Sequence, residues 1–399
     1  MLFGRFPHDG SFQHKIFKAG WQREASGRSL VFRREKTRLP SAAADGTLAP
    51  MNVTVAISGG TDSLFALLSL KEQGYGVTAL HARFLSGPED ESLLSDMEAL
   101  CGRLGIVLHV VDLSEEFRHH VMEPFALAHA AARTPNPCAL CNRAMKFGSL
   151  FDHAMEWGER FATGHYVAME EHPSYGRTLR AGRDGAKDQS YFLALVPAER
   201  LRRCLFPLAE WKKADIRVWL ADRGMTPPVP AESQEICFIP NDNHYAWLEA
   251  RKAEGLKLPG PGPVLLAGEN RIIAQHRGLW QYTEGQRRGL GIPWKEPLYA
   301  LKRLPETNTL VVGPKNMLPV TSCLAGELNL MVAPSLWPQE TLVRVRYHQA
   351  PVPARVTLSE DRMNIAFLSP QQPPAPGQIA AVYDRDGFVL AGGVIEKSA

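Results

Sequence analysis

Residues 58–63 combine small, hydroxyl and acidic side chains in the order Ser58-Gly59-Gly60-Thr61-Asp62-Ser63. Adjacent glycines let the backbone turn tightly with its amides pointing inward, and serine hydroxyls can donate hydrogen bonds to phosphate oxygens. An apolar run at 53–57 precedes the segment and leucines at helical spacing follow it, so it should join a strand to a helix N-terminus, which favours an anion. The segment is therefore predicted to bind phosphate. A glycine-rich turn that only caps the helix is the alternative.

The end of this loop and Asp62 indicate which phosphate chemistry to expect. The loop lacks the Gly-Lys-Ser/Thr ending of P-loop kinases and GTPases. Release of pyrophosphate with transfer of AMP therefore fits better than transfer of a γ-phosphoryl group. We expect the Asp62 carboxylate to organise Mg²⁺ or pyrophosphate, which favours an enzyme that uses ATP.

Two cysteines, Cys138 and Cys141, form a Cys-x-x-Cys pair directly after a segment with two prolines, 134–137. The prolines predict that one helix ends and another begins, so both thiols should lie near a helix N-terminus. The helix dipole, with Arg143 and Lys146 nearby, is expected to lower the pKa of a thiol and make it reactive. A zinc site competes, but no second Cys or His pair stands at ligand spacing. A thioredoxin-like redox pair is a further alternative, although its usual aromatic and acidic surroundings are missing.

The other four cysteines have apolar neighbours. Taken alone, Cys237 in the segment 236–239 predicts a core cysteine on a buried strand. Cys101, Cys204 and Cys323 accompany no polar motif, and we expect them to be structural.

The elements that must position these residues alternate between short β-branched runs and helical periods from residue 53 onward. This alternation predicts a doubly wound α/β domain with a parallel sheet, which we place at residues 51–240. Strands are predicted at 53–57, 77–84 and 106–111, and helices at 93–104, 115–131 and 143–158.

Proline and glycine gather at 258–263, which indicates a linker into smaller units. We place a small central domain at 241–318 and a domain of antiparallel strands, a barrel or a sandwich, at 319–399. The dipeptide Asp386-Gly387 predicts a hairpin there.

The first 50 residues contain nine Lys or Arg and four Asp or Glu and show no strand or helix period. We interpret residues 1–50 as an N-terminal extension, either disordered or not translated, with Met51 as the start. A basic targeting peptide is a third option, which the acidic residues disfavour.

The bulk composition limits the class of protein. A hydrophobic fraction of 45%, a charged fraction of 22% and no apolar run of membrane-spanning length predict a soluble protein. Six cysteines spread over 399 residues are not a small disulfide framework, so we expect a cytoplasmic, reducing location. The net charge of +3 is too small to decide whether the partner is a nucleic acid.

Several segments, taken in chain order, resemble the tRNA-specific 2-thiouridylases, which put sulfur on the wobble uridine of certain tRNAs. The similarity covers residues 53–396 and runs through 58–63, 134–148, Ala162-Thr163-Gly164-His165-Tyr166, 187–193, 233–239, 276–292 and 376–378. It implies an α/β domain of the PP-loop type that binds ATP, a small central domain and a C-terminal β-barrel.

The resemblance also implies residue roles. Cys237 matches the cysteine that bears a persulfide, contrary to its interpretation as a core residue, and Cys141 matches its partner nucleophile. Contacts to ATP are implied for Ala56, Ile57, the loop Ser58 to Ser63, Ala82 and Gly164. Contacts to tRNA are implied for Asn136, Pro137, Cys138, His165, Lys187, Asp188, Gln189, Arg346, Tyr347 and Gln378.

The implied chemistry is adenylation of the uridine 2-oxygen, with Mg²⁺ neutralising charge, followed by attack of the persulfide sulfur. Cys141 either attacks the persulfide and leaves a disulfide with Cys237, or helps to free hydrosulfide. A sulfur-relay protein or a cysteine desulfurase is the implied donor. This sequence departs from relatives at Glu232, where they usually have Asp, and at Cys138, where some carry a carboxylate.

A basic, aromatic segment supports a tRNA partner independently. Residues 276–303 carry six Lys or Arg and two Glu, with Trp280, Tyr282, Trp294 and Tyr299. Basic groups can bind phosphates and rings can stack on bases. A solvated basic face over core aromatics is the alternative.

Two other functions compete with tRNA thiolation. A synthetase that adenylates a small molecule needs no pair of reactive cysteines, so Cys141 and Cys237 argue against it. A non-catalytic tRNA-binding relative would not need the intact Asp62.

Overall fold

The structure, a computed structural model, describes residues 21–26, 29–34, 51–85, 87, 89–229 and 236–399. It divides into two compact units, Met1–Ala49 and Pro50–Ala399. In the first unit, β1 (Trp21–Ser26) and β2 (Ser29–Arg34) pair as an antiparallel hairpin, which the sequence pattern did not predict. The rest of the expectation for residues 1–50 lies outside the described residues.

The α/β domain is built on a five-stranded parallel sheet in the order β5-β4-β3-β6-β9. The strands are β3 (Asn52–Ala56), β4 (Gly76–Arg83), β5 (Leu108–Asp112), β6 (Arg160–Ala162) and β9 (Cys204–Leu205). The order reverses at β3, because β4 and β5 follow on one side and β6 lies on the other. Ligand crevices of such sheets open at this reversal, beyond the carboxyl ends of the strands. The predicted doubly wound fold is confirmed.

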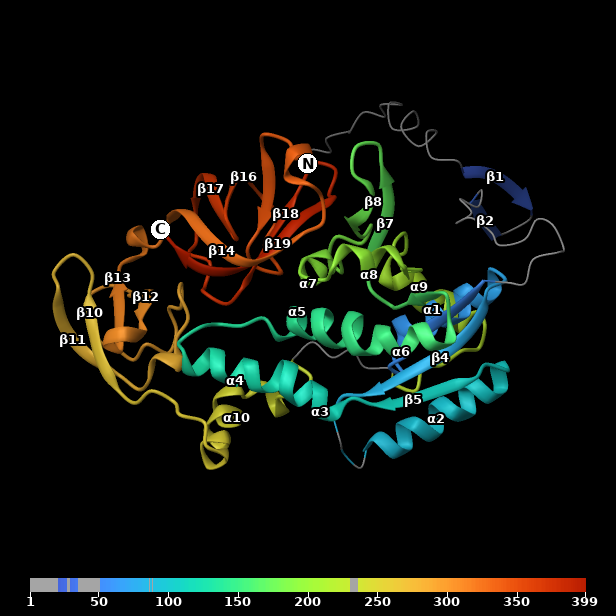
Figure 1. The fold of residues 1–399 in the computed structure, drawn as a ribbon, viewed down its shortest axis with the longest axis horizontal. Helices are drawn as coiled ribbons and strands as arrows, with labels where there is room; N and C mark the ends of the chain where they lie inside the picture. The colour runs from blue at the N-terminus through green and yellow to red at the C-terminus, as the bar shows by residue number, and fades with distance from the viewer. Residues whose placement is uncertain (1–20, 27–28, 35–50, 86, 88, 230–235) are drawn as a thin grey trace, which may run out of the picture. The chain divides into compact units, whose positions relative to one another are not determined.

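Helices connect these strands, and Figure 1 shows α2 beside β5. The helices are α1 (Thr61–Glu72), α2 (Glu89–Leu104), α3 (Ser114–Phe117), η2 (Arg118–Met122), α4 (Glu123–Ala130), α7 (Ser190–Leu193), α8 (Ala198–Arg202) and α9 (Lys213–Ala221). A hairpin of β7 (Val167–His172) and β8 (Gly176–Ala181) is inserted after β6. Helix α1 is held firmly, since Phe65 packs edge-on against Trp211 and Trp219 with ring centroids 4.9 Å apart in both pairs.

The helix predicted at 143–158 begins earlier than its apolar period indicates. The segment comprises α5 (Pro137–Cys141), η3 (Asn142–Ser149) and α6 (Leu150–Trp157), with a kink at Gly148, whose backbone is not helical. Proline is tolerated at the first helical position, and the Asn136 side chain caps the helix by accepting from the Ala139 amide at 3.0 Å. Both cysteines of the pair therefore lie within the helix rather than before it.

The remaining chain forms a small central sheet and a barrel. The central strands are β10 (Gly262–Leu266), β11 (Arg271–His276), β12 (Tyr299–Leu304) and β13 (Thr309–Gly313), in the order β11-β10-β13-β12, and α10 (His244–Ala250) precedes them. The closed barrel, drawn in orange and red in Figure 1, runs β14-β17-β16-β15-β18-β19. Its strands are β14 (Val320–Leu330), β15 (Thr341–Arg344), β16 (Val352–Ser359), β17 (Arg362–Gln371), β18 (Ile379–Tyr383) and β19 (Val389–Ser398).

The hairpin predicted at Asp386-Gly387 is confirmed, because β18 and β19 pair antiparallel around it and Gly387 has φ +85°. Among the described residues, no helix is both long and apolar enough to cross a membrane.

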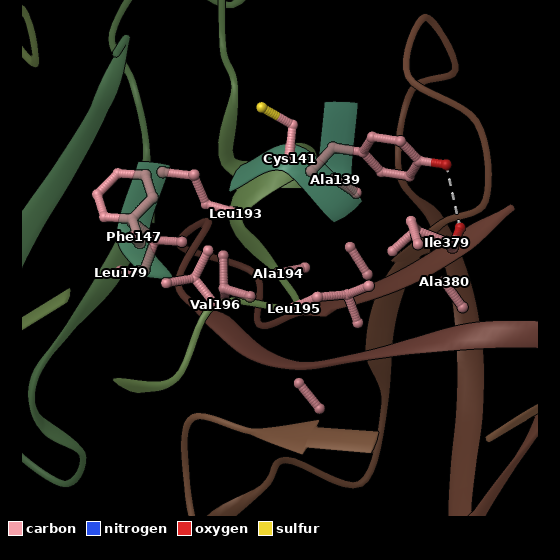
Figure 2. Close-up of a cluster of buried hydrophobic side chains, with 14 of the residues drawn as sticks. Ala139, Cys141, Phe147, Leu179, Leu193, Ala194, Leu195, Val196, Ile379 and Ala380 are labelled. Carbon is pink, nitrogen blue, oxygen red and sulfur yellow. Dashed lines mark hydrogen bonds between the residues drawn. The ribbon is translucent and has the colours of Figure 1, made fainter. Parts of the chain in front are cut away.

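The barrel packs on the α/β domain through the chain between α7 and α8. Figure 2 shows Leu193 to Val196 in one buried cluster with Ala139 and Cys141 of α5 and with Ile379 and Ala380 of the barrel. The Tyr191 hydroxyl donates to the carbonyl of Ile379 at 3.2 Å. This packing brings barrel side chains toward the start of α5.

Candidate functional site

The loop between β3 and α1 has the geometry of an anion cradle. The Ser63 hydroxyl accepts from the Ser58 amide at 3.1 Å and donates to the Gly60 carbonyl at 3.0 Å, which closes the turn. Gly59 has φ +76°, a conformation that favours glycine. Gly60 caps α1 without any side-chain hydrogen bond, so no side chain of the cap competes with a ligand at this helix end.

Asp62 lies in the first turn of α1, and two side chains that the sequence analysis missed hold it. Its Oδ1 accepts from the Tyr166 hydroxyl at 2.6 Å and from the Lys213 ammonium at 2.7 Å. Lys213 is buried and belongs to the first turn of α9, 151 residues away in sequence. No local motif marks Lys213, whereas Tyr166 falls within a segment of the family resemblance.

The residues predicted to contact ATP gather at the carboxyl edge of the sheet. Ala56 ends β3, Ala82 lies near the end of β4, and Gly164 follows β6. These strands flank the point where the strand order reverses, as a nucleotide crevice requires. The residues fit a bound adenine nucleotide, although their individual contacts stay predictions.

Gly164 has a steric reason to be glycine. A Cβ there would lie 2.8 Å from the Asp62 carbonyl carbon and 3.0 Å from the Asp62 Cβ. Gly164→Ala is therefore expected to displace the phosphate loop at a cost of about 1–3 kcal/mol, which corresponds to roughly tenfold to hundredfold weaker ATP binding. Calorimetric titration with ATP measures this. Gly185→Ala, where a Cβ meets nothing within 4 Å, is the matched control, and equal affinity of the two variants would contradict the assignment.

The three candidate reactive cysteines differ in exposure. Cys138 and Cys237 are exposed, and Cys141 is buried. Cys237 lies in a turn between residue 235 and α10, so the buried strand predicted from its apolar neighbours is wrong. The neighbouring side chain accounts for that apolar pattern, because Phe238 packs on Phe125 and Trp247 with ring centroids 5.4 and 5.1 Å apart. Glu232 and residues 233–235 lie outside the described residues.

The expectation of lowered thiol pKa values is wrong for this structure. Desolvation by the surrounding protein raises the pKa of Cys138 and Cys237, and it raises the pKa of Cys141 to about 12. The positive charge of Lys146 acts in the opposite direction but is the smaller effect. The helix dipole and the basic residues can be recognised in the sequence, whereas the desolvation of the thiols depends on parts of the chain that only folding brings near them. Cys101, Cys204 and Cys323 are buried, as expected for structural cysteines.

The raised pKa values predict how alkylation of the free protein depends on pH. Because the thiolate is the reacting form, alkylation of Cys138 and Cys237 by iodoacetamide should rise about tenfold per pH unit from pH 7 to 9 without a plateau. Free cysteine, whose pKa is about 8.5, should already level off above that pH. Peptide mass spectrometry measures both rates. A plateau below pH 8 at either residue would contradict the burial argument.

The residues predicted to contact tRNA occupy positions of different exposure. Cys138 is exposed; Lys187, Gln189, Arg346, Tyr347 and Gln378 are partly exposed; Asn136, Pro137, His165 and Asp188 are buried. The Tyr347 ring lies tilted against the Phe192 ring, with centroids 4.3 Å apart. Burial raises the pKa of Tyr347, and the charges of Lys187 and Cys138 act on it as well. Lys187 and Cys138 therefore lie within electrostatic range of Tyr347.

Some members of this set hold other parts of the protein. Both ring nitrogens of His165 are hydrogen-bonded, to Thr163 at 2.8 Å and to Asn142 at 3.1 Å, and burial holds its pKa well below the usual value. Asp188 accepts from Arg344 of the barrel at 2.8 Å. Contact of these residues with tRNA stays a prediction.

Thr134, just before α5, is held by both C-terminal domains. Gln378 donates to its carbonyl at 2.8 Å, its amide donates to the Pro376 carbonyl at 2.7 Å, and Arg303 donates to its hydroxyl at 3.0 Å. The barrel and the central domain therefore fix where the Cys-x-x-Cys helix begins.

The basic, aromatic segment 276–303 is only partly a surface. Trp280 and Tyr282 are buried, and Arg303 is buried in an ion pair with Glu284 at 2.6 Å. The interpretation of these three side chains as RNA contacts is wrong, because they fill the core. A surface pocket of about 350 Å³ remains, lined by Arg287, Trp294 and Lys295 among others.

Comparison with known proteins agrees with this architecture. Family models described as tRNA methyl transferase HUP domain, tRNA methyl transferase PRC-barrel domain and Aminomethyltransferase beta-barrel domain match residues 51–241, 256–314 and 320–395.

Curated relatives match almost over their whole length. The tRNA-specific 2-thiouridylase MnmA of Nitratidesulfovibrio vulgaris strain Miyazaki F is 52% identical over 353 residues, covering 86% of this chain and 99% of that protein. Proteins of the same name from Oleidesulfovibrio alaskensis and Lawsonia intracellularis are 50% and 44% identical, again over 86% of this chain and 99% of each relative. The chain belongs to the tRNA-specific 2-thiouridylase family, as its motifs indicated.

Proposed function

We propose that this protein uses ATP to replace the 2-oxygen of a tRNA wobble uridine with sulfur carried as a persulfide on Cys237. The observation that carries the proposal is the segment 163–166, which joins the phosphate loop to the cysteine helix. Gly164 packs on Asp62, and the Tyr166 hydroxyl donates to that carboxylate at 2.6 Å. His165 bonds Asn142, the residue after Cys141, at 3.1 Å. Activation and sulfur chemistry would thus share one rigid support.

The activation step uses the loop. A uridine 2-oxygen leaves poorly, but after transfer of AMP it departs as part of AMP. The N-terminus of α1 would hold the departing pyrophosphate. A bound Mg²⁺ would neutralise negative charge on the phosphates. Asp62, with its side chain 32% exposed beside the loop, fits a site in which one carboxylate and the substrate phosphates share the ion. Among the described residues, no group of three or more His, Cys, Asp or Glu is placed to hold a metal ion.

The sulfur step uses the cysteines. The terminal persulfide sulfur attacks uridine C2, and AMP leaves. Cys141 then attacks the Cys237 side of the persulfide bond, which transfers the sulfur to uridine and leaves a Cys141–Cys237 disulfide. In the alternative route Cys141 first frees hydrosulfide, which attacks C2. Either route ends with the same disulfide, and a reductant must restore both thiols. A sulfur-relay protein or a cysteine desulfurase would reload Cys237.

A PP-loop synthetase acting on a small molecule is the second candidate. Such an enzyme gives no reason for an exposed Cys237 within electrostatic range of Cys138 and Cys141. We therefore favour tRNA as the substrate.

The direct test is reconstitution. Purified full-length protein, unmodified tRNA, ATP, Mg²⁺ and a persulfide donor should yield 2-thiouridine, detected by mass spectrometry of the digested tRNA. Cells lacking the protein should lose that nucleoside. Unchanged 2-thiouridine in those cells, or ATP consumption without tRNA, would reject the proposal.

A further inference from the structure

Three cysteines belong to the candidate sulfur site: Cys138 and Cys141 in α5, and Cys237 in the turn before α10. Cys138 and Cys141 are three residues apart on one helix, so their side chains are neighbours on its surface. Phe238 anchors the turn of Cys237 on Phe117 and Phe125, with ring centroids 5.8 and 5.4 Å apart. These rings flank η2, on which α5 packs. The three sulfurs are close enough for their charges to influence one another.

The cluster has one thiol more than the proposed reaction uses. Sulfur transfer needs Cys237 to carry the persulfide and Cys141 to attack it. The third thiol, Cys138, is exposed, whereas Cys141 is buried. Thiol–disulfide exchange depends on access to the attacked sulfur, so exposure decides where an external reductant can react.

We propose that Cys138 resets the site by taking over the disulfide. The inference rests on the proposed function. The Cys138 thiolate attacks the Cys141 sulfur of the Cys141–Cys237 disulfide. A Cys138–Cys141 bond forms, the Cys141–Cys237 bond breaks, and Cys237 leaves as a thiolate. No net oxidation occurs in this exchange. A dithiol reductant then attacks the sulfur of Cys138, the more exposed residue of the pair, becomes a disulfide itself and restores both thiols.

Two features favour this route over direct reduction at Cys237. The attack by Cys138 is intramolecular. A well-oriented intramolecular reaction is much faster than the same reaction with a partner in solution. The exchange also frees Cys237 at once, so a sulfur donor can reload that residue before the reductant arrives.

Disulfide mapping tests the exchange. Protein loaded with persulfide is given tRNA, ATP and Mg²⁺ without reductant, quenched with iodoacetamide after one turnover, and digested for mass spectrometry. We expect a Cys138–Cys141 link in the wild type and a Cys141–Cys237 link in Cys138→Ser. Cys101→Ser, a buried cysteine outside the cluster, is the control and should behave as the wild type. A persistent Cys141–Cys237 link in the wild type would overturn the proposal.

Kinetics give a second readout. For each variant, the steady-state rate of 2-thiouridine formation is divided by the rate of the first turnover. A change in tRNA contact alters both rates alike and therefore cancels in this ratio. At about 1 mM dithiol this ratio should fall about tenfold in Cys138→Ser, because the intramolecular attack is lost. An unchanged ratio would overturn the proposal.

Failure of the proposed function is distinguishable from failure of this inference. If the wild type forms no 2-thiouridine in the first turnover, the function fails. Mild oxidation of the protein with diamide, followed by the same mapping, then tests without any sulfur transfer whether Cys138 forms a disulfide with Cys141. A Cys138–Cys141 link supports the exchange pair, and its absence rejects it.

Discussion

Replacing Cys237 with serine is expected to separate activation of the tRNA from delivery of sulfur. Serine cannot hold a persulfide sulfur, so Cys237→Ser should form 2-thiouridine on the order of a thousandfold more slowly or not at all. Pyrophosphate release that depends on tRNA should continue, because the phosphate loop and Asp62 belong to β3 and α1. A phosphate assay coupled to pyrophosphatase measures activation, and nucleoside mass spectrometry of the same sample measures delivery of sulfur.

Cys141→Ser completes this experiment. It should keep pyrophosphate release and lose the formation of free 2-thiouridine. In the direct route the tRNA should stay joined to Cys237 through the persulfide sulfur, and in the hydrosulfide route the persulfide should stay on Cys237. Cys323 is buried in the barrel, so Cys323→Ser controls for the general effect of losing a thiol. An active Cys141→Ser beside an inactive Cys138→Ser would reverse the assignment of the pair.

The sequence predicts the fold well wherever local patterns carry the information. The strand at 53–57, the helix that follows and the hairpin at Asp386-Gly387 were each predicted within a few residues, because apolar period and turn chemistry are local. The start of α5 was missed by six residues, since Asn136 and Pro137 begin the helix without any apolar period.

Properties set by neighbours distant in the chain could not be predicted. The thiol pKa values depend on how deeply α5 lies beneath the 193–196 segment and the barrel. Trp280 and Tyr282 look like stacking residues in sequence but are core residues, because burial of a ring depends on the tertiary packing around it. Lys213 was missed for the same reason, since nothing near it in the chain marks its contact with Asp62.

Removing the Asp62 carboxylate is expected to have the second large effect. Asp62→Asn keeps the shape of the side chain, and its amide oxygen can still accept from Tyr166. The neutral amide no longer balances the charge of Lys213, and it is a weaker ligand for Mg²⁺ than a carboxylate. Removing one interaction of this kind at developing charge typically costs on the order of 10²–10³ in rate. We expect a loss of that size in tRNA-dependent pyrophosphate release, whereas binding of tRNA, measured by filter retention, should change little.

Lys213→Met distinguishes a supporting ion pair from a carboxylate that acts on its own. If Lys213 only orients Asp62, Lys213→Met alone should slow pyrophosphate release less than Asp62→Asn does. The double variant should then be no slower than Asp62→Asn, because coupled residues are not additive. Losses that multiply would instead show that Lys213 binds phosphate independently. Thermal unfolding of all three variants checks that the core around Phe65 and Trp211 is intact. Full turnover in Asp62→Asn would refute the assignment of the loop, since the metal and the pyrophosphate would then need no carboxylate there.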